Sequence, residues 1–131
     1  MSRNYFTEQE LNPKGHPLSD EVKANLAELA RRVSLVREEF AAPMVVTSGF
    51  RSEQDQRRIY KNATRVPLGS MHLVGCAVDI ADRDGQLAEF VTSHVALLEK
   101  AGLWCEDVTK TRGWVHFQLR PPRSGSRFFL P

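Results

Sequence analysis

A helical pattern of apolar residues occupies residues 19–41. Apolar side chains recur there at steps of three and four residues, which traces one face of an α-helix. They are Val22, Leu26, Leu29, Val33, Val36 and Phe40. Ser19 is a suitable N-cap, and Pro43 is expected to end the helix. Because such a helix must bury its apolar face, the rest of the chain has to supply a layer for it to pack on.

Three short segments predict strands. Residues 44–48 are rich in β-branched residues and stop at Gly49, which indicates a buried strand carrying Arg51 just past its end. Residues 76–81 predict a strand in which Asp79 faces a site while its two neighbours face the core. Residues 114–119 predict a third strand. Its two-residue period places Trp114, His116 and Gln118 on one face.

Two further helices are expected over 52–62 and 86–101. Ser52 and Asp55 have the spacing of a capping box, and Gly102 suits the end of the later helix. Residues 63–70 contain Pro67 and Gly69 and predict a loop, and the segment 121–131 is expected to fold back onto the body. These elements predict an α+β fold: a small, mostly antiparallel sheet with helices packed on one face and a cleft on the open face.

The length and net charge of the chain limit the kinds of function to be expected. A chain of 131 residues has room for one ordinary core, so residues 1–131 are expected to form a single domain. The formal charge of +2 gives little reason to expect a nucleic acid, and we expect no membrane partner and a monomer. The opening residues lack the apolar centre of a signal peptide, which predicts synthesis in the cytoplasm without export by that route.

His72, Asp79 and His116 form a candidate metal-ligand set. Two imidazoles and one carboxylate suit zinc, and three protein ligands are typical of catalytic zinc sites, which keep a fourth position open. Each residue taken singly is also typical of an ordinary loop, turn or half-buried strand position. Small residues at Gly75 and Ala77 are expected to let the backbone pass close to the metal. Cys76 and Cys105 are interpreted as small buried hydrophobic residues.

The motif around these residues resembles the metal signature of the M15 metallopeptidases. The matching positions are Ser70-x-His72-x-x-Gly75-x-Ala77-x-Asp79, Trp114-x-His116, and Ser48-Gly49-Phe50-Arg51-Ser52, which is similar to the family's Ser-Gly-Tyr-Arg-Ser. The resemblance implies one zinc ion held by His72, Asp79 and His116. It also implies hydrolysis, by zinc-activated water, of a D-Ala-D-Ala or L-Ala-D-Glu bond in peptidoglycan stem peptides. Cell-wall carboxypeptidases and phage endolysins belong to this family, so a phage-encoded enzyme acting on a host wall is one expectation.

The resemblance also implies roles around the metal. Arg51 would hold a substrate carbonyl or carboxylate, and Ser70, Trp114 and Gln118 would line the substrate site. Many members place an acidic general base three residues before the final histidine, but here that position is Gly113. Glu106 is the predicted substitute, and a solvated loop carboxylate is the alternative interpretation of this residue.

Two alternatives to hydrolysis follow from the missing acid. The first is a zinc-dependent module on the same fold that binds peptidoglycan peptides without cutting them. The second is a structural zinc, which the two-histidine, one-aspartate set favours less because structural sites are mostly filled by cysteine.

Overall fold

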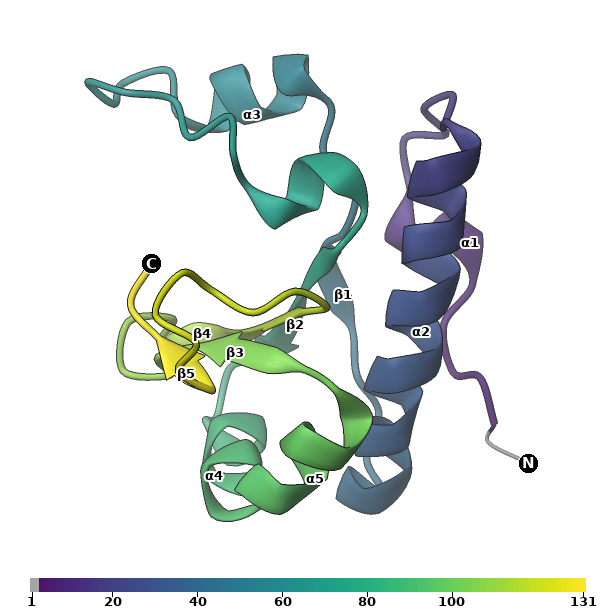
Figure 1. Cartoon of the computed structure of the whole chain (residues 1–131), viewed down its shortest axis with the longest axis vertical. Coiled ribbons are helices and arrows are strands. Elements are labelled where there is room, and N and C mark those ends of the chain that lie inside the picture. Colours follow the sequence, from purple (N-terminus) through teal and green to yellow (C-terminus); the bar gives the residue numbers. More distant parts are fainter. Residues whose placement is uncertain (1–2) are drawn as a thin grey trace.

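The computed structural model describes residues 3–131, which form helices around one five-stranded sheet (Figure 1). In chain order the elements are α1 (Glu8–Leu11), α2 (Asp20–Phe40), β1 (Val46–Ser48), α3 (Glu53–Ile59), the 3₁₀ helix η1 (Met71–Val74), β2 (Ala77–Asp82), α4 (Gln86–Ser93), α5 (Val95–Ala101), β3 (Trp104–Glu106), β4 (Gly113–Gln118) and β5 (Phe128–Phe129). In this described part of the chain no helix is both long and apolar enough to span a membrane.

The sheet has the strand order β1-β2-β4-β3-β5. Three of its four pairings are antiparallel, and the pairing of β3 with β5 is parallel. The central pair, β2 and β4, is in register along its whole length, and Asp79 lies directly opposite His116. The α+β fold with a mostly antiparallel sheet is therefore confirmed.

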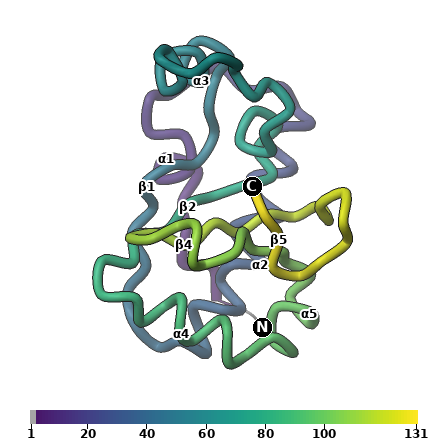
Figure 2. Tube along the Cα trace, turned by 90° about the vertical axis from the view of Figure 1, so that its left-hand side faces the viewer, coloured from purple at the N-terminus to yellow at the C-terminus, as the bar shows by residue number. Residues whose placement is uncertain are grey.

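One hydrophobic core joins the helices to a single face of the sheet. Val78 and Ile80 of β2 face this core, as do Val115 and Phe117 of β4. The apolar stripe of α2 packs into the same cluster, together with residues of α4 and α5. Because side chains alternate along a strand, Asp79 and His116 point to the opposite face. Figures 1 and 2 both show α3 at one end of the molecule and α4 at the other, with the sheet between them.

The predicted caps form, and they place the helices. The Ser19 hydroxyl accepts a hydrogen bond from the Val22 N–H at 3.2 Å, and α2 ends at a left-handed Ala41. Ser52 and Asp55 make the reciprocal bonds of a capping box at the start of α3. That helix ends at Ile59, three residues before the predicted boundary, because no apolar stripe continues past it to be buried.

The single helix predicted for residues 86–101 is wrong, because the chain forms α4 and α5 with a break at His94. The backbone there leaves helical geometry, with φ −128° and ψ 47°. A ring nitrogen of His94 lies 2.7 Å from the Phe90 carbonyl, and the Ser93 hydroxyl donates to the Glu89 carbonyl at 2.8 Å. These side chains take over carbonyls that helical N–H groups would use, which favours a break.

The prediction of a buried first strand is also wrong. β1 is an edge strand, and Val45 just before it is 63% exposed. A short apolar run looks alike at the edge and the centre of a sheet, so the pattern could not separate the two. Four short elements, α1, η1, β3 and β5, were not predicted, although the final segment does fold back onto the body as β5.

Candidate metal centre

Three elements bring His72, Asp79 and His116 together. His72 stands on η1, Asp79 on β2 and His116 on β4, and one ligand atom of each lies within 4.8 Å of the others. His116 Nδ1 is 2.9 Å from Asp79 Oδ1, and His72 Nε2 is 3.4 Å from Asp79 Oδ2. All three side chains are buried. The three residues that the sequence analysis selected therefore form one compact group, which offers two nitrogen atoms and one oxygen atom to a metal ion.

An oxygen acceptor orients each imidazole from its far side. His72 Nδ1 lies 2.8 Å from the Gly49 carbonyl oxygen, and His116 Nε2 lies 2.8 Å from Gln118 Oε1. The Gln118 amide in turn donates to the Arg120 carbonyl at 2.8 Å. Each ring can thus donate one N–H outward and turn its other nitrogen toward Asp79. Metal-binding histidines are commonly held in this way.

The turn before β2 positions His72. The Ser70 hydroxyl accepts from the His72 N–H at 3.3 Å and caps η1, while Gly75 ends it with φ +75°. A Cβ at Gly75 would lie 3.0 Å from Val22 Cγ1 and from the Val22 carbonyl oxygen. The expectation that Gly75 makes room for a metal is therefore wrong, since it makes room for α2. Ser70, predicted to line the substrate site, has its hydroxyl on the backbone N–H of His72 in the structure.

Arg51 lies beside Asp79, and its guanidinium group contacts three side chains. Its Nη2 is 3.3 Å from Asp79 Oδ2, its Nε donates to Ser48 Oγ at 2.9 Å, and its Nη1 donates to Gln56 Oε1 at 3.1 Å. Gln56 is fully buried and donates to the Pro67 carbonyl at 2.8 Å. Sequence reasoning missed Ser48 and Gln56. The only signal for Gln56 was its place on the first turn of α3, one residue after the capping Asp55.

Charge inside the group stabilises an ionised Asp79. Burial by itself would raise the pKa of Asp79, but hydrogen bonds from His116 and His72 outweigh it and hold the pKa below its usual range. Burial would lower the pKa of His116, whereas its hydrogen bond to Asp79 and the Asp79 charge raise that pKa overall. With both rings neutral, the donor set is a carboxylate between two imidazoles, which suits a borderline divalent cation such as zinc.

Glu106 is the acid that lies next to this group. It ends β3, and its Oε1 is 3.8 Å from His116 Nδ1. Gly113, at the position where the resemblance implies an acidic base, has φ +94°, a conformation in which an acidic residue would be strained. The backbone at residue 113 thus favours glycine, while a carboxylate reaches the group from the neighbouring strand.

The remaining predicted residues have distinct surroundings. Trp114 is 37% exposed at the start of β4, on the His116 face, and Gln118 is buried against His116. Both cysteines are buried, as expected, and burial raises the pKa of the Cys76 and Cys105 thiols, which makes them poor metal ligands. Within residues 3–131 neither belongs to a potential metal-binding group.

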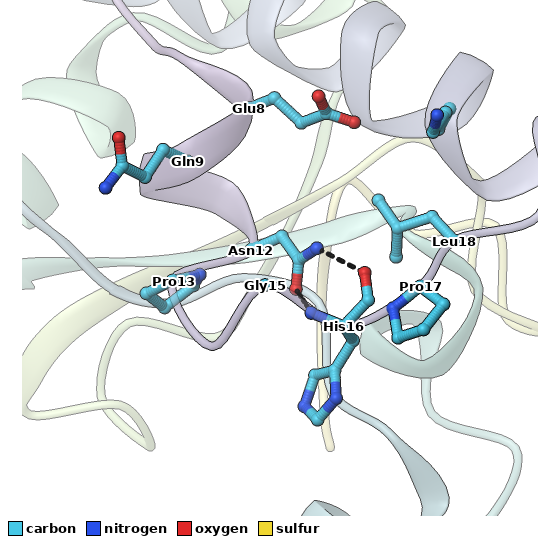
Figure 3. Close-up of a pocket in the computed structure, with 9 residues that line it drawn as sticks. Glu8, Gln9, Asn12, Pro13, Gly15, His16, Pro17 and Leu18 are labelled. Carbon is cyan, nitrogen blue, oxygen red and sulfur yellow. Dashed lines mark hydrogen bonds between the residues drawn. The ribbon is translucent and has the colours of Figure 1, made fainter.

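A separate surface hollow lies in the lead-in to α2 (Figure 3). Its lining includes Glu8, Asn12, His16 and Leu18, but none of the three candidate ligands. The dashed lines in Figure 3 show Asn12 bonded to both backbone groups of His16, at 2.9 and 3.2 Å. These bonds order the loop, and the hollow is not part of the candidate metal centre.

Comparisons with known proteins agree with this geometry. A family model described as Peptidase M15 matches residues 4–118. The fold is similar to that of the L-Ala D-Glu endopeptidase ChiX from Serratia marcescens, with a TM-score of 0.57 and 22% sequence identity over 88% of this chain and 99% of that chain. No curated protein sequence matches the chain. At this identity the structural likeness concerns the fold, whereas the family match spans the elements that carry the site.

Proposed function

The chain belongs to the peptidase M15 family, and from this we propose that it is a zinc-dependent peptidase that cuts a peptide bond in peptidoglycan stem peptides. One observation carries the proposal: a buried group of His72, Asp79 and His116 has the cation Arg51 beside its aspartate and the acid Glu106 beside His116. These are the parts that hydrolysis of an amide requires.

The donor set would hold zinc through His72, Asp79 and His116. Zinc bound by such a set supplies Lewis-acid activation of water and of a carbonyl group. The protein's own contribution is to fix the three donors before any ion arrives. The Gly49 carbonyl and the Gln118 amide do this by holding the far nitrogens of the two rings.

Arg51 would bind an oxygen of the substrate, either the carbonyl that gains charge during attack or a neighbouring carboxylate. Its bonds to Ser48 and Gln56 hold the guanidinium in one place, so little reorganisation is needed when charge develops. Its contact with Asp79 keeps this positive charge close to the metal ligands.

Glu106 would move the protons. A carboxylate at this point can accept a proton from the attacking water and return it to the leaving amine nitrogen. Its side chain is about one-fifth exposed, which leaves it open to solvent and to substrate while it stays near His116. Trp114, on the same face as His116, would line the substrate site.

The test is digestion of purified peptidoglycan and of short stem peptides by the zinc-loaded protein, with products identified by mass spectrometry. We expect one defined bond to be cut, and the product masses to tell a D-Ala-D-Ala bond from an L-Ala-D-Glu bond. Glu106→Gln should retain zinc and lose activity by about 10²-fold or more. His116→Ala should lose both zinc and activity.

Asp107→Asn is the matched control for Glu106→Gln. Asp107 is the next residue along the chain, but its carboxylate is engaged by the Thr109 N–H and hydroxyl, at 2.9 and 2.7 Å, and asparagine keeps an acceptor there. Full activity in this variant with loss in Glu106→Gln would assign the base. If the zinc-loaded protein binds the peptides and cuts none, the domain is instead a zinc-dependent recognition module.

A further inference from the structure

The segment that follows the family match adds a strand beside the metal centre. The family model ends at residue 118, and β5 then pairs with β3 (Figure 1). The Cys105 N–H donates to the Arg127 carbonyl at 2.9 Å, and the Asp107 N–H donates to the Phe129 carbonyl at 2.7 Å. Backbone bonds thus fix this segment on both sides of Glu106.

A side-chain clamp holds the start of the same strand. The guanidinium of Arg127 lies 4.4 Å from the centre of the Trp104 ring and donates to the Leu103 carbonyl at 2.8 Å. A cation over an aromatic face adds to the backbone pairing. The position of β5 along β3 is therefore determined by several independent contacts, and so is the position of the side chains it carries.

The register of this pairing sends the two phenylalanines to opposite faces of the sheet. Phe128 lies opposite Cys105, which is fully buried in the core, and Phe128 packs against that core. Phe129 lies opposite Glu106. Because paired residues on adjacent strands share a face, Phe129 stands on the face that carries Glu106 and the metal ligands.

Phe129 reaches the metal centre itself. The centre of its ring is 6.1 Å from that of His116, at an interplanar angle of 84°, which is an edge-to-face contact. The side chain is only half-buried, so part of the ring remains open to solvent. The groups around His116 include the acidic residues Asp79 and Glu106, and Phe129 adds apolar surface beside them.

We propose that Phe129 is a specificity-determining residue whose ring contacts the small apolar side chain next to the bond that is cut. This inference rests on the proposed function. D-Ala-D-Ala and L-Ala-D-Glu share one feature, an alanine that supplies the carbonyl of the bond, so its methyl group is the common apolar target. An aromatic wall on the His116 side would favour that methyl group over hydrogen and would leave binding of zinc unaffected.

The test compares two peptides, a stem peptide and the same peptide with glycine in place of that alanine. We expect the protein to prefer the alanine peptide by about 10-fold in kcat/KM, the size of effect that one methyl group in an apolar site gives. In Phe129→Ala this preference should fall to within about twofold. Phe129→Leu, which keeps apolar surface, should retain part of it, and zinc affinity should be the same in all three proteins.

Two controls separate this role from general damage. Phe128→Ala removes the neighbouring ring from the core, so it should lower the free energy of unfolding while keeping the alanine preference. Val45→Ser changes an exposed apolar residue before the far edge strand, and should alter neither quantity. A preference that fell equally in Phe128→Ala would show that β5 acts only through stability and would overturn the proposal.

The same comparison is also made by measuring binding. The dissociation constants of the two peptides are determined for the Glu106→Gln variant and for the double variant Glu106→Gln, Phe129→Ala. If the peptides bind but are never cut, hydrolysis fails as the function, and a loss of the binding preference in Phe129→Ala still supports the role of Phe129. An unchanged preference, or the absence of binding by either peptide, overturns it.

Discussion

Single side chains around the candidate metal centre orient the histidine rings of the group. Gln118 was predicted to bind substrate, but its side chain is buried and its amide oxygen lies 2.8 Å from His116 Nε2. The amide is held in that direction by its own bond to the Arg120 carbonyl. Its contacts in the structure are therefore those of a residue that orients a ligand ring.

Gln118→Leu tests this orientation. The change keeps the size of the side chain and leaves the His116 N–H without an acceptor, so we expect zinc affinity to fall by about 10- to 100-fold. Titration against a chelating dye measures this in the absence of peptide. Gln118→Glu, which retains an acceptor oxygen, should keep most of the affinity. Gln54→Leu on the exposed face of α3 is the control, and equal losses in both leucine variants would contradict the assignment.

Gly49 is the second residue on which the ligands depend. A Cβ there would lie 2.3 Å from the Leu11 carbonyl oxygen, which also accepts the Phe50 N–H at 2.8 Å. Since both groups are backbone, Gly49→Ala forces the chain to move, and we expect a loss of about 1–3 kcal/mol in the free energy of unfolding. Zinc affinity should fall as well, because the Gly49 carbonyl orients His72.

Urea unfolding and zinc titration measure the two effects in Gly49→Ala. Gly69→Ala is a close control, because nothing lies within 4 Å of a Cβ at Gly69. It should change neither quantity. A Gly49→Ala protein as stable as the unaltered protein would mean that β1 and Leu11 can separate without cost.

At the scale of elements, the start of α4 depends on a carboxylate four residues before its first residue. Gly85 at the N-cap has no side chain to offer. Asp82, at the end of β2, accepts from the Leu87 N–H at 2.8 Å and from the Ala88 N–H at 2.9 Å. These are donors that the first turn of a helix leaves unpaired. Asp82 therefore ties α4 to the strand that carries Asp79.

Asp82→Ala should lower the free energy of unfolding by about 1–2 kcal/mol, the usual cost of losing a helix cap, because two backbone donors near the core lose their partner. The midpoint of thermal or urea unfolding measures this. Arg83→Ala, at the exposed neighbouring position, should be neutral. An unchanged midpoint in Asp82→Ala would mean that water replaces the carboxylate without loss.

At the scale of the whole molecule, Asp55 links two segments that are distant in the sequence. It belongs to α3, the helix whose Gln56 holds Arg51, and it contacts the segment that precedes α2. Its carboxylate lies 2.7 Å from Lys14 Nζ and 2.9 Å from His16 Nε2, and it accepts the Ser52 N–H at 3.1 Å. Arg58 of α3 also lies within 3.6 Å. Figure 3 shows His16 beside the hollow, on the loop that Asn12 orders. Segments about 40 residues apart in the sequence meet at this carboxylate.

This junction should make stability depend on pH. Burial would raise the pKa of Asp55, but hydrogen bonds from Lys14, Ser52 and His16 outweigh it and hold the pKa well below its usual range. A carboxyl with a lower pKa in the folded than in the unfolded protein stabilises the fold above the unfolded pKa of about 4. That stability is lost as the pH falls toward the folded pKa.

Asp55→Asn should therefore be less stable than the unaltered protein at pH 7, and the difference should shrink as the pH falls below about 4. Urea unfolding of the zinc-free proteins at several pH values measures the difference. Glu53→Gln removes a charge from an exposed pair with Arg57 on the same helix, and should give little difference at any pH. A constant difference for Asp55→Asn across this range would contradict a role for its ionised form.

The sequence alone determined the family, the fold class and the candidate metal group, because each depends on local patterns. The spacing of His72 and Asp79 and the alternation around His116 are properties of short segments. The caps at Ser19 and Ser52 also formed as predicted, because a cap needs only residues within one turn of the helix.

Only the tertiary structure decided what lies beside that group. The position of Glu106 next to His116, the hold of Gln56 on Arg51 and the place of Phe129 each depend on which strands and loops become neighbours. Such contacts join segments far apart in the chain, and no local pattern encodes them. The break at His94 is a local effect that the apolar pattern does not reveal, since it comes from side-chain bonds within one turn of the helix. The edge position of β1, in contrast, depends on which strands pair across the sheet.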